Sequence, residues 1–457
     1  MGHMLLRQTQ HTRPGHDFLL RLSWARSEHE ENCMHTRAGR FITCFLIFFL
    51  FCGTVAGCRA NDAGFHADDA GLVFWAAMTA DEIEILRVIA DEYRAERGVP
   101  VTVREIGLFE INTKLELAAP AGRGPDLISI SHTSVGVLSL MGLLEPLDRA
   151  ALPLADCPPD LVDAFRYDAV LYGAPLTVES YGLVVNEDLL PEAPGTFEEM
   201  LDAARRLTVD ADNDGEAEVY GFLTDPSNFY FTFPFYDAYG GYIFSETDHN
   251  TVDPTRMGFC TPGGIAGLSA LFDIAGPGGS IPRGIDYTII GELFGEGHVA
   301  MMIHGVYPIP YYRSLGINVG YHPIPPTESG RRPRPLANLM GVGVSAYSQS
   351  PESAEDFLAY LLEPKRLRLI LEGSGTINVM ANPMVYREED FISEPLLSTA
   401  VEIAGMSYPF PNDPAGELVW DAVGAAATAV VDGSLQPEEA LCRMEERLET
   451  VIKEMRR

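Results

Sequence analysis

Acidic side chains at alternate positions form the segment of this sequence best suited to bind a metal ion. Asp210, Asp212 and Asp214 are followed by Gly215. This is the spacing of the first half of a calcium loop, in which carboxylate oxygens hold the cation and glycine permits a sharp turn. The twelfth position of such a loop needs a glutamate, and here it is Gly221. We therefore predict a solvated acidic turn, keep calcium binding as the alternative, and assign no metal site.

Nucleotide-binding and catalytic motifs are the next candidates for chemistry. Residues 341–346 have the glycine spacing of a dinucleotide-binding loop, but Tyr-Ser-Gln-Ser-Pro at 347–351 stands where the helix of such a loop should begin. The sequence contains no Walker loop, no HExxH zinc motif and no GxSxG nucleophile motif. We therefore expect a protein that is not an enzyme and has no cofactor.

The N-terminal region has the layout of a secretion signal. An apolar run at 41–56 follows Arg37 and Arg40, and it is shorter than the ~20 residues that a membrane-spanning helix needs. Residues 1–33 carry three glutamates, which signal peptides lack, so the true start is expected at Met34. We assign residues 1–57 to the signal region and 58–71, which are small and polar, to a flexible tether.

The end of this signal region resembles the lipobox of bacterial lipoproteins. Small residues in the run Val-Ala-Gly at 55–57 directly precede Cys58. The resemblance implies that Cys58 becomes the mature N-terminus and carries a thioether-linked lipid with acyl chains such as palmitate. A plain signal anchor is the alternative.

The net charge of the chain excludes two kinds of binding partner. The chain has 65 acidic against 32 basic side chains, a formal charge of −33, which argues against binding to nucleic acid or to an anionic membrane surface.

After the N-terminal region the only cysteines are Cys157, Cys260 and Cys442, with no CxxC motif and no zinc-site spacing. They could form at most one disulfide. We expect them to be mostly buried small hydrophobic residues.

Hydrophobic periodicity predicts an α/β protein that begins near Leu72. A strand at 72–75 precedes the capping box Thr-Ala-Asp-Glu at 79–82, which should start a helix that ends at Gly98. A strand around 99–103 follows, so the body begins as a β-α-β unit with a mainly parallel sheet. Further elements are predicted at 126–130, 135–141, 181–185, 196–207, 294–303, 351–362 and 437–455.

Nine segments in a fixed order resemble family 1 of the bacterial extracellular solute-binding proteins, the maltose-binding-protein-like proteins. Each segment is a weak signal by itself, but together they extend over nearly the whole body from Leu72. The segments are 124–132, 173–190, 196–200, 220–222, 228–234, 239–244, 294–301, 341–344 and 354–358.

The resemblance implies a two-lobed periplasmic-binding-protein fold of type II. Each lobe would be a mixed, mainly parallel sheet flanked by helices, with hinge crossings near 177–180, 317–321 and 379–385. The N-terminal lobe would comprise 72–178 plus 322–380, and the C-terminal lobe 179–321 plus 381–457. Such a protein would be a monomer that passes its solute to an ABC permease and its ATPase, in the periplasm or on the outer face of the cytoplasmic membrane.

Matching the family motifs residue by residue gives candidate ligand contacts. Sugars present apolar faces and hydroxyl edges, so a site for them combines flat aromatic rings with carboxylates and amides. Core packing is the alternative for the aromatic candidates, and a hinge hydrogen bond is the alternative for the acid. The candidates are Trp75, Glu179, Asn228, Tyr230, Tyr307 and Trp420.

Departures from the family pattern leave the ligand open. The charged sugar contacts of the maltose binder are replaced here by uncharged residues, so maltose itself is doubtful. The replacements are Thr133-Ser134, Thr79-Ala80 and Gly424. A sugar is our first expectation. A glycerophosphodiester such as glycerophosphocholine, held by cation–π attraction, is the alternative within the same role. A carbohydrate-active enzyme and a non-transport surface lipoprotein are the alternatives of another class.

Overall fold

The computed structural model describes residues 71–211, 217–247, 252–276, 279, 281–375, 377–387 and 394–456, all within one compact unit. The predicted signal region, residues 58–70 of the tether with Cys58, and residues 212–216 of the acidic loop lie outside these residues. None of the helices in the described part is long and apolar enough to cross a membrane.

The larger sheet has seven strands in the order β13-β6-β12-β3-β1-β2, with β14 also paired to β12. Pairing is parallel between β1 and β2, β1 and β3, and β12 and β14, and antiparallel where β12 meets β3 and β6 and where β13 meets β6. The strands are β1 (Leu72–Ala76), β2 (Val101–Glu105), β3 (Leu127–Ser131), β6 (Ala174–Glu179), β12 (Leu336–Val344), β13 (Val379–Met380) and β14 (Tyr408–Pro409).

The second sheet follows the first without a loop. Only Ser180 separates β6 from β7 (Tyr181–Asn186), which pairs antiparallel with β10 (Met301–Gly305) and β11 (Val319–His322). Parallel bridges at Tyr220–Val299 and Leu223–Met302 add to the mixed character of this sheet. Two short hairpins complete the strands: β4 (Arg166–Tyr167) with β5 (Val170–Leu171), and β8 (Ser245–Glu246) with β9 (Val252–Asp253).

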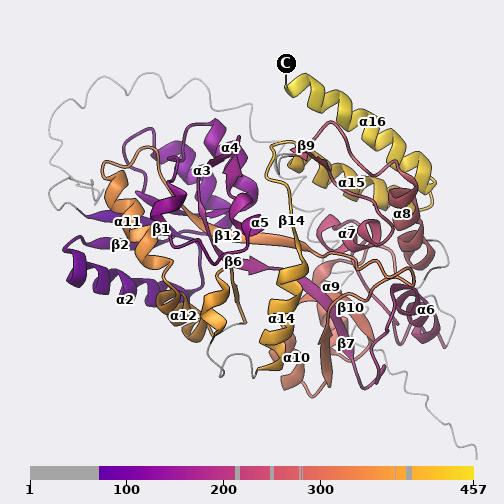
Figure 1. Cartoon of the computed structure of the whole chain (residues 1–457). Coiled ribbons are helices and arrows are strands. Elements are labelled where there is room, and N and C mark those ends of the chain that lie inside the picture. The colour runs from indigo at the N-terminus through magenta and orange to yellow at the C-terminus, as the bar shows by residue number, and fades with distance from the viewer. Residues whose placement is uncertain are drawn as a thin grey trace, which may run out of the picture. The chain divides into compact units, whose positions relative to one another are not determined.

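Helices cover both sheets, so the predicted α/β architecture is confirmed (Figure 1). In the first part α2 packs on β2 and α12, and α11 packs on β12; in the later part α7 and α16 both pack on α8. The α-helices are α2 (Ala80–Arg97), α3 (Leu108–Ala118), α4 (Val135–Leu140), α5 (Pro159–Asp163), α6 (Phe197–Leu207), α7 (Phe229–Ala238), α8 (Pro262–Ala275), α9 (Tyr287–Gly295), α10 (Ile309–Ser314), α11 (Pro351–Leu361), α12 (Pro364–Gly373), α14 (Pro395–Met406), α15 (Gly416–Val431) and α16 (Pro437–Met455). Short 3₁₀ turns lie at His132–Ser134, Arg149–Ala151 and Pro383–Tyr386.

The predicted helix starts are confirmed in atomic detail. Thr79 and Glu82 form a reciprocal capping box at α2, and Thr196 and Glu199 do the same at α6, so each box satisfies backbone N–H groups that the first turn leaves free. The helix α2 ends as predicted at Gly98, whose φ of +80° is a left-handed conformation that favours glycine.

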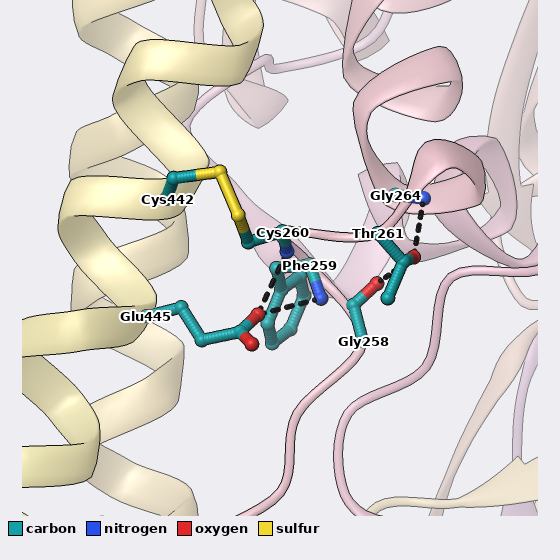
Figure 2. Close-up of a disulfide and its surroundings, with 7 residues drawn as sticks. All are labelled: Gly258, Phe259, Cys260, Thr261, Gly264, Cys442 and Glu445. Atoms are coloured by element: carbon teal, nitrogen blue, oxygen red, sulfur yellow. Dashed lines mark hydrogen bonds between the residues drawn. A yellow bond between two sulfur atoms is a disulfide. The ribbon is translucent and has the colours of Figure 1, made fainter.

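The expectation for the late cysteines is wrong for two of them. Cys260 and Cys442 form a disulfide that joins the loop before α8 to α16, while Cys157 is free and buried as predicted. Figure 2 shows that the Glu445 carboxylate lies beside the disulfide and accepts the backbone N–H groups of Phe259 at 3.0 Å and Cys260 at 2.7 Å. The two cysteines are 182 positions apart, so only the packing of α16 against α8 brings them together.

Candidate functional site

A group of aromatic rings gathers around the start of α7, and this aromatic cluster is the centre of the candidate site. Asn228 caps the helix: its side-chain oxygen accepts the backbone N–H of Tyr230 at 3.1 Å. The cap fixes the first turn of α7, which carries Tyr230 and Phe231. Tyr230 stacks on Trp420 of α15 with ring centroids 6.3 Å apart and planes inclined by 29°. Trp420 also meets Phe410 edge-on at 5.2 Å.

Tyr181 on β7 packs against Tyr230 and supports this cluster. It is fully buried and meets the Tyr230 ring edge-on at 4.7 Å. Its hydroxyl donates to the carbonyl of Tyr230 and accepts the backbone N–H of Leu336 at 2.8 Å. The hydroxyl therefore makes one donated and one accepted hydrogen bond inside the protein, and the buried Tyr181 supports Tyr230 rather than facing a ligand.

A second stack of rings extends the cluster towards α9 and β10. Phe231 lies parallel to Tyr287 at 5.1 Å, and Tyr287 stacks on His304 at 4.5 Å. The hydroxyl of Tyr287 contacts the hydroxyl of Tyr307. Tyr307 keeps 57% of its surface exposed, so it presents a ring to solvent at the end of this stack. Tyr287 and His304 were not among the predicted ligand residues, because no sequence motif marks them.

The rings of the cluster are uncharged at neutral pH. Burial lowers the pKa of His304 to about 4, so its imidazole is neutral. Burial, and to a lesser degree the Glu179 charge, raise the pKa of the Tyr230 hydroxyl well above its usual value, which keeps it a hydrogen-bond donor. Neutral rings and hydroxyls of this kind suit an uncharged partner that has both apolar faces and polar edges.

Glu179 supplies a carboxylate next to the cluster. It ends β6, its side chain is exposed, and its backbone carbonyl accepts the Tyr230 hydroxyl at 3.2 Å. Asn338 lies opposite Glu179 in the β6–β12 register and donates its side-chain amide to the Glu179 carboxylate at 3.3 Å. The carboxylate therefore keeps free acceptor positions for a ligand hydroxyl.

A polar edge continues from Glu179 across the seven-stranded sheet. The hydroxyl of Ser131, at the end of β3, donates to the Asn338 side-chain oxygen at 3.0 Å and lies 2.9 Å from the hydroxyl of Thr133. All four residues, Glu179, Asn338, Ser131 and Thr133, are at least partly accessible. These residues could not be predicted as one group from the sequence, because only the pairing of distant strands brings them together.

The structure brings five of the six predicted ligand residues into one region. Tyr230 contacts three of the others: its hydroxyl donates to the Glu179 carbonyl, its backbone N–H donates to the Asn228 side chain, and its ring stacks on Trp420. Tyr307 lies at the end of the ring stack, where its hydroxyl contacts that of Tyr287. The sixth, Trp75, is only 7% exposed in β1, opposite Arg104 and Ile128 in the register, and takes part in none of the ring contacts of the aromatic cluster.

The described residues contain no group of His, Cys, Asp or Glu side chains able to hold a metal ion. Residues 212–216 of the acidic loop that has half of the calcium spacing lie outside the described ranges, so the solvated acidic turn stays the prediction there and calcium binding its alternative. The chemistry that the candidate site itself can perform is binding: stacking against the rings, and hydrogen bonding to the carboxylate, amide and hydroxyl groups.

Comparison with known proteins identifies the family. Residues 79–366 match the family model of the bacterial extracellular solute-binding proteins. The match covers more than half of the chain, and the chain belongs to this family. Members of the family and the relatives found are solute-binding proteins and not enzymes, so the carbohydrate-active enzyme of the sequence analysis is excluded.

Individual relatives and solved structures are also solute-binding proteins. The galactooligosaccharide-binding protein of Bacillus subtilis (strain 168) is 27% identical over 367 residues, which cover 79% of this chain and 85% of the relative. A maltooligosaccharide ABC transporter solute-binding lipoprotein of Streptococcus pneumoniae (strain ATCC BAA-255 / R6) is 24% identical over 359 residues, 75% of this chain and 81% of the relative. The crystal structure of a cyclo/maltodextrin-binding protein with maltotetraose superposes with a TM-score of 0.76 at 26% identity, covering 84% of this chain and 97% of that one. The type II periplasmic-binding-protein fold is thereby confirmed.

Proposed function

We propose that the protein is the sugar-binding subunit of an ABC importer and captures a neutral sugar at the aromatic cluster. The observation that carries the proposal is the combination of Tyr230 stacked on Trp420 with the exposed Glu179 carboxylate beside them. Rings bind the apolar faces of a sugar and the carboxylate binds its hydroxyl edge. The relatives named for galactooligosaccharides and maltooligosaccharides support a sugar as the ligand class.

Capture would proceed by closure of two lobes around the solute. We assign 72–178 plus 322–380 to the N-terminal lobe and 179–321 plus 381–457 to the C-terminal lobe. The direct passage from β6 to β7 through Ser180 supports a hinge at this position, since a single residue separates strands of the two sheets. Glu179 stands next to that hinge, so a ligand bound there would contact both lobes and favour the closed form.

Secretion and a lipid anchor on Cys58 would hold the protein on the outer face of the cytoplasmic membrane or in the periplasm. The disulfide between Cys260 and Cys442 supports an oxidising compartment outside the cytoplasm. The streptococcal relative is named a lipoprotein, which supports the anchor. The protein would act as a monomer that delivers the sugar to a membrane permease driven by a separate ATPase, and it would have no nucleic-acid partner.

The other ligand class considered from the sequence gains no support. None of the relatives reported above is named for a glycerophosphodiester, and a phosphodiester would bring its negative charge to Glu179. A surface lipoprotein without a transport role would not need the ring and carboxylate arrangement. The neutral sugar therefore stands as the proposed ligand.

Thermal melting and calorimetry on the purified protein test this proposal. The panel comprises glucose, maltose, maltotriose, galactobiose, galactotriose and glycerophosphocholine. We expect at least one neutral sugar to raise the melting temperature, because a ligand at 100 times its Kd stabilises the folded state by about 2.7 kcal/mol. Glycerophosphocholine should have no effect. A panel in which no sugar acts, or in which only glycerophosphocholine acts, overturns the proposal.

A further inference from the structure

Three segments that are far apart in the sequence meet where the chain passes between the two sheets. Ser180 links β6 to β7, Leu336 begins β12, and Ser407 directly precedes β14. The pairing of β12 with β14 places Tyr408 opposite Leu336. In the lobe assignment proposed above, Leu336 belongs to the N-terminal lobe, and Ser180 and Ser407 belong to the C-terminal lobe. Hydrogen bonds from Leu336 to these segments therefore join the lobes.

The peptide unit between Pro335 and Leu336 is held by the C-terminal lobe at both of its polar atoms. The Pro335 carbonyl accepts the backbone N–H of Tyr408 at 2.8 Å, and the Leu336 N–H donates to the Tyr181 hydroxyl at 2.8 Å. The carbonyl of Leu336 itself lies in the next peptide plane. Rotation about the two soft backbone bonds of Leu336 therefore moves this carbonyl while the preceding peptide unit stays in place.

The Leu336 carbonyl meets a pair of serine hydroxyls that have fewer protons than hydrogen-bonding contacts. Ser180 Oγ lies 3.0 Å from the Leu336 carbonyl and 2.7 Å from Ser407 Oγ. Ser407 Oγ also lies 2.8 Å from the carbonyl of Ile403, one turn earlier in α14. Each hydroxyl has a single proton to donate. Two protons therefore serve three oxygen–oxygen contacts.

Two arrangements of these protons each give two hydrogen bonds. In the first, Ser180 donates to Leu336 and accepts the proton of Ser407. In the second, Ser180 donates to Ser407, and Ser407 donates to Ile403. Only the first ties Ser180 to the N-terminal lobe. Passage to the second needs only the rotation of two hydroxyl groups, and neither arrangement leaves a serine donor without a partner.

We propose that the hydroxyls of Ser180 and Ser407 form a switch that balances two arrangements of the lobes. When the chain turns at Leu336, its carbonyl leaves Ser180, and the two protons change to the second arrangement. The number of hydrogen bonds stays the same, so a ligand needs only a small difference in affinity to shift the population. The inference rests on the two-lobe closure of the proposed function and adds the groups that set its balance.

The switch is joined to the candidate ligand site through Tyr181. The Tyr181 hydroxyl that accepts the Leu336 N–H also donates to the backbone carbonyl of Tyr230. The fixed side of the junction and the first turn of α7 therefore share one hydroxyl, so the ring proposed to bind the sugar stays in register with the turning point.

Fluorescence energy transfer between the lobes of the purified, sugar-free protein tests the inference. The dyes are attached through p-azidophenylalanine at Val88 and Leu315, two exposed positions, one on each lobe. In Ser407→Ala the first arrangement keeps one hydrogen bond, from Ser180 to Leu336, whereas the second keeps none. The population ratio should therefore shift about three- to tenfold towards the lobe distance of this structure, the factor expected for one net hydrogen bond.

The other variants should leave the ratio within about twofold of the wild type, which is less than the effect of one hydrogen bond. In Ser180→Ala the bond from Ser407 to Ile403 is made in both arrangements, so neither is favoured. In the double variant Ser180→Ala, Ser407→Ala both arrangements lose all their bonds. Ser269→Ala is the matched control, because its hydroxyl also donates to the carbonyl four positions earlier, at 2.7 Å in α8.

Three outcomes overturn the inference: no shift in Ser407→Ala, an equal shift in the double variant, and a loss of the present lobe distance in Ser180→Ala alone. The last would make the bond from Ser180 to Leu336 a simple tie between the lobes. Calorimetry of the wild type with maltotriose and galactobiose separates this test from that of the proposed function. Since the shifts are measured without sugar, a wild type that binds neither sugar counts against the proposed function, and the expected shifts would still support the switch.

Discussion

The hydroxyl of Tyr230 donates a hydrogen bond to the backbone carbonyl of Glu179 at 3.2 Å, although the two residues are 51 positions apart. The bond ties the first turn of α7 to the last residue of β6. It therefore places a ring and a carboxylate side by side at the point where the chain passes from one sheet to the other.

Replacement of Trp420 by alanine should weaken sugar binding by about 1–3 kcal/mol, which is roughly a 5- to 150-fold increase in Kd. Trp420 is the ring that stacks on Tyr230, so its loss removes one apolar surface for the ligand. Calorimetry with a sugar that binds the wild type measures the effect. Trp420→Phe should retain most of the affinity, which separates stacking from a loss of packing against Phe410. Unchanged affinity in Trp420→Ala would remove this residue from the site.

Glu179→Gln should lower sugar affinity by about 1–2 kcal/mol and leave the melting temperature of the free protein unchanged. The amide preserves the shape and can still accept the Asn338 hydrogen bond, but hydrogen bonds to a charged acceptor are about twice as strong as those to a neutral one. Glu105→Gln, at the exposed carboxyl end of β2, is the matched control. An affinity equal to that of the wild type would indicate that Glu179 serves only as a hinge residue.

The sequence predicted the local elements well because their signals are local. The capping boxes at Thr79 and Thr196 and the glycine at 98 lie within a few residues of the helix ends that they define. The side-chain environment of Trp75 is not a local property of this kind. β1 lies between β2 and β3 and the Trp75 ring is buried, so its role as a ligand contact stays a prediction.

The remaining site residues depend on contacts between distant parts of the chain. Asn338 faces Glu179 only because β12 pairs with β6 in one particular register, and a shift by one residue would turn it to the other face. Tyr287 and His304 join the cluster through stacking between α9 and β10. The disulfide likewise joins Cys260 to Cys442 across 182 positions. None of these pairings leaves a local pattern in the sequence.

The lipid anchor on Cys58 predicts how the N-terminus is processed. In cells that process lipoproteins, the N-terminal peptide of the wild type should begin at Cys58 and carry the mass of the lipid. Cys58→Ala should remove both the lipid and the cleavage at this position, so that the protein keeps its signal region, whereas Cys52→Ala, within the apolar run, should be processed like the wild type. The mass of the N-terminal peptide provides the measurement. A wild type that keeps the apolar run and carries no lipid would favour a signal anchor.

Reduction of the disulfide should lower the free energy of unfolding by about 2–5 kcal/mol, since it closes a long loop of the unfolded chain. Sugar affinity should not change, because Glu445 still holds the backbone of Phe259 and Cys260. Denaturant unfolding with and without dithiothreitol measures the effect on the wild type. In the double variant Cys260→Ala, Cys442→Ala the reductant should have no effect. A wild type that is equally stable when reduced would contradict this prediction.

The buried His132 should make the free energy of unfolding depend on pH. Its ring is completely buried: Nδ1 accepts the backbone N–H of Leu339 at 3.1 Å, so the proton sits on Nε2, which donates to the carbonyl of Phe410 at 2.9 Å. Burial lowers the pKa from 6.5 to about 4, because a charged ring would lose its hydration and turn an N–H towards Leu339.

The direction of the effect follows from which state binds the proton first. The unfolded chain protonates His132 near pH 6.5 and the folded protein only near pH 4, so stability is unaffected by this residue above about pH 6.5 and falls as the pH drops towards 4. The full loss is about 3 kcal/mol at 1.36 kcal/mol per pKa unit. His132→Gln, which cannot titrate, should flatten the stability profile over this range by that amount. An NMR titration of the His132 ring with a midpoint near 6.5 would contradict the prediction, because a ring that takes up its proton so readily cannot be held neutral between Leu339 and Phe410.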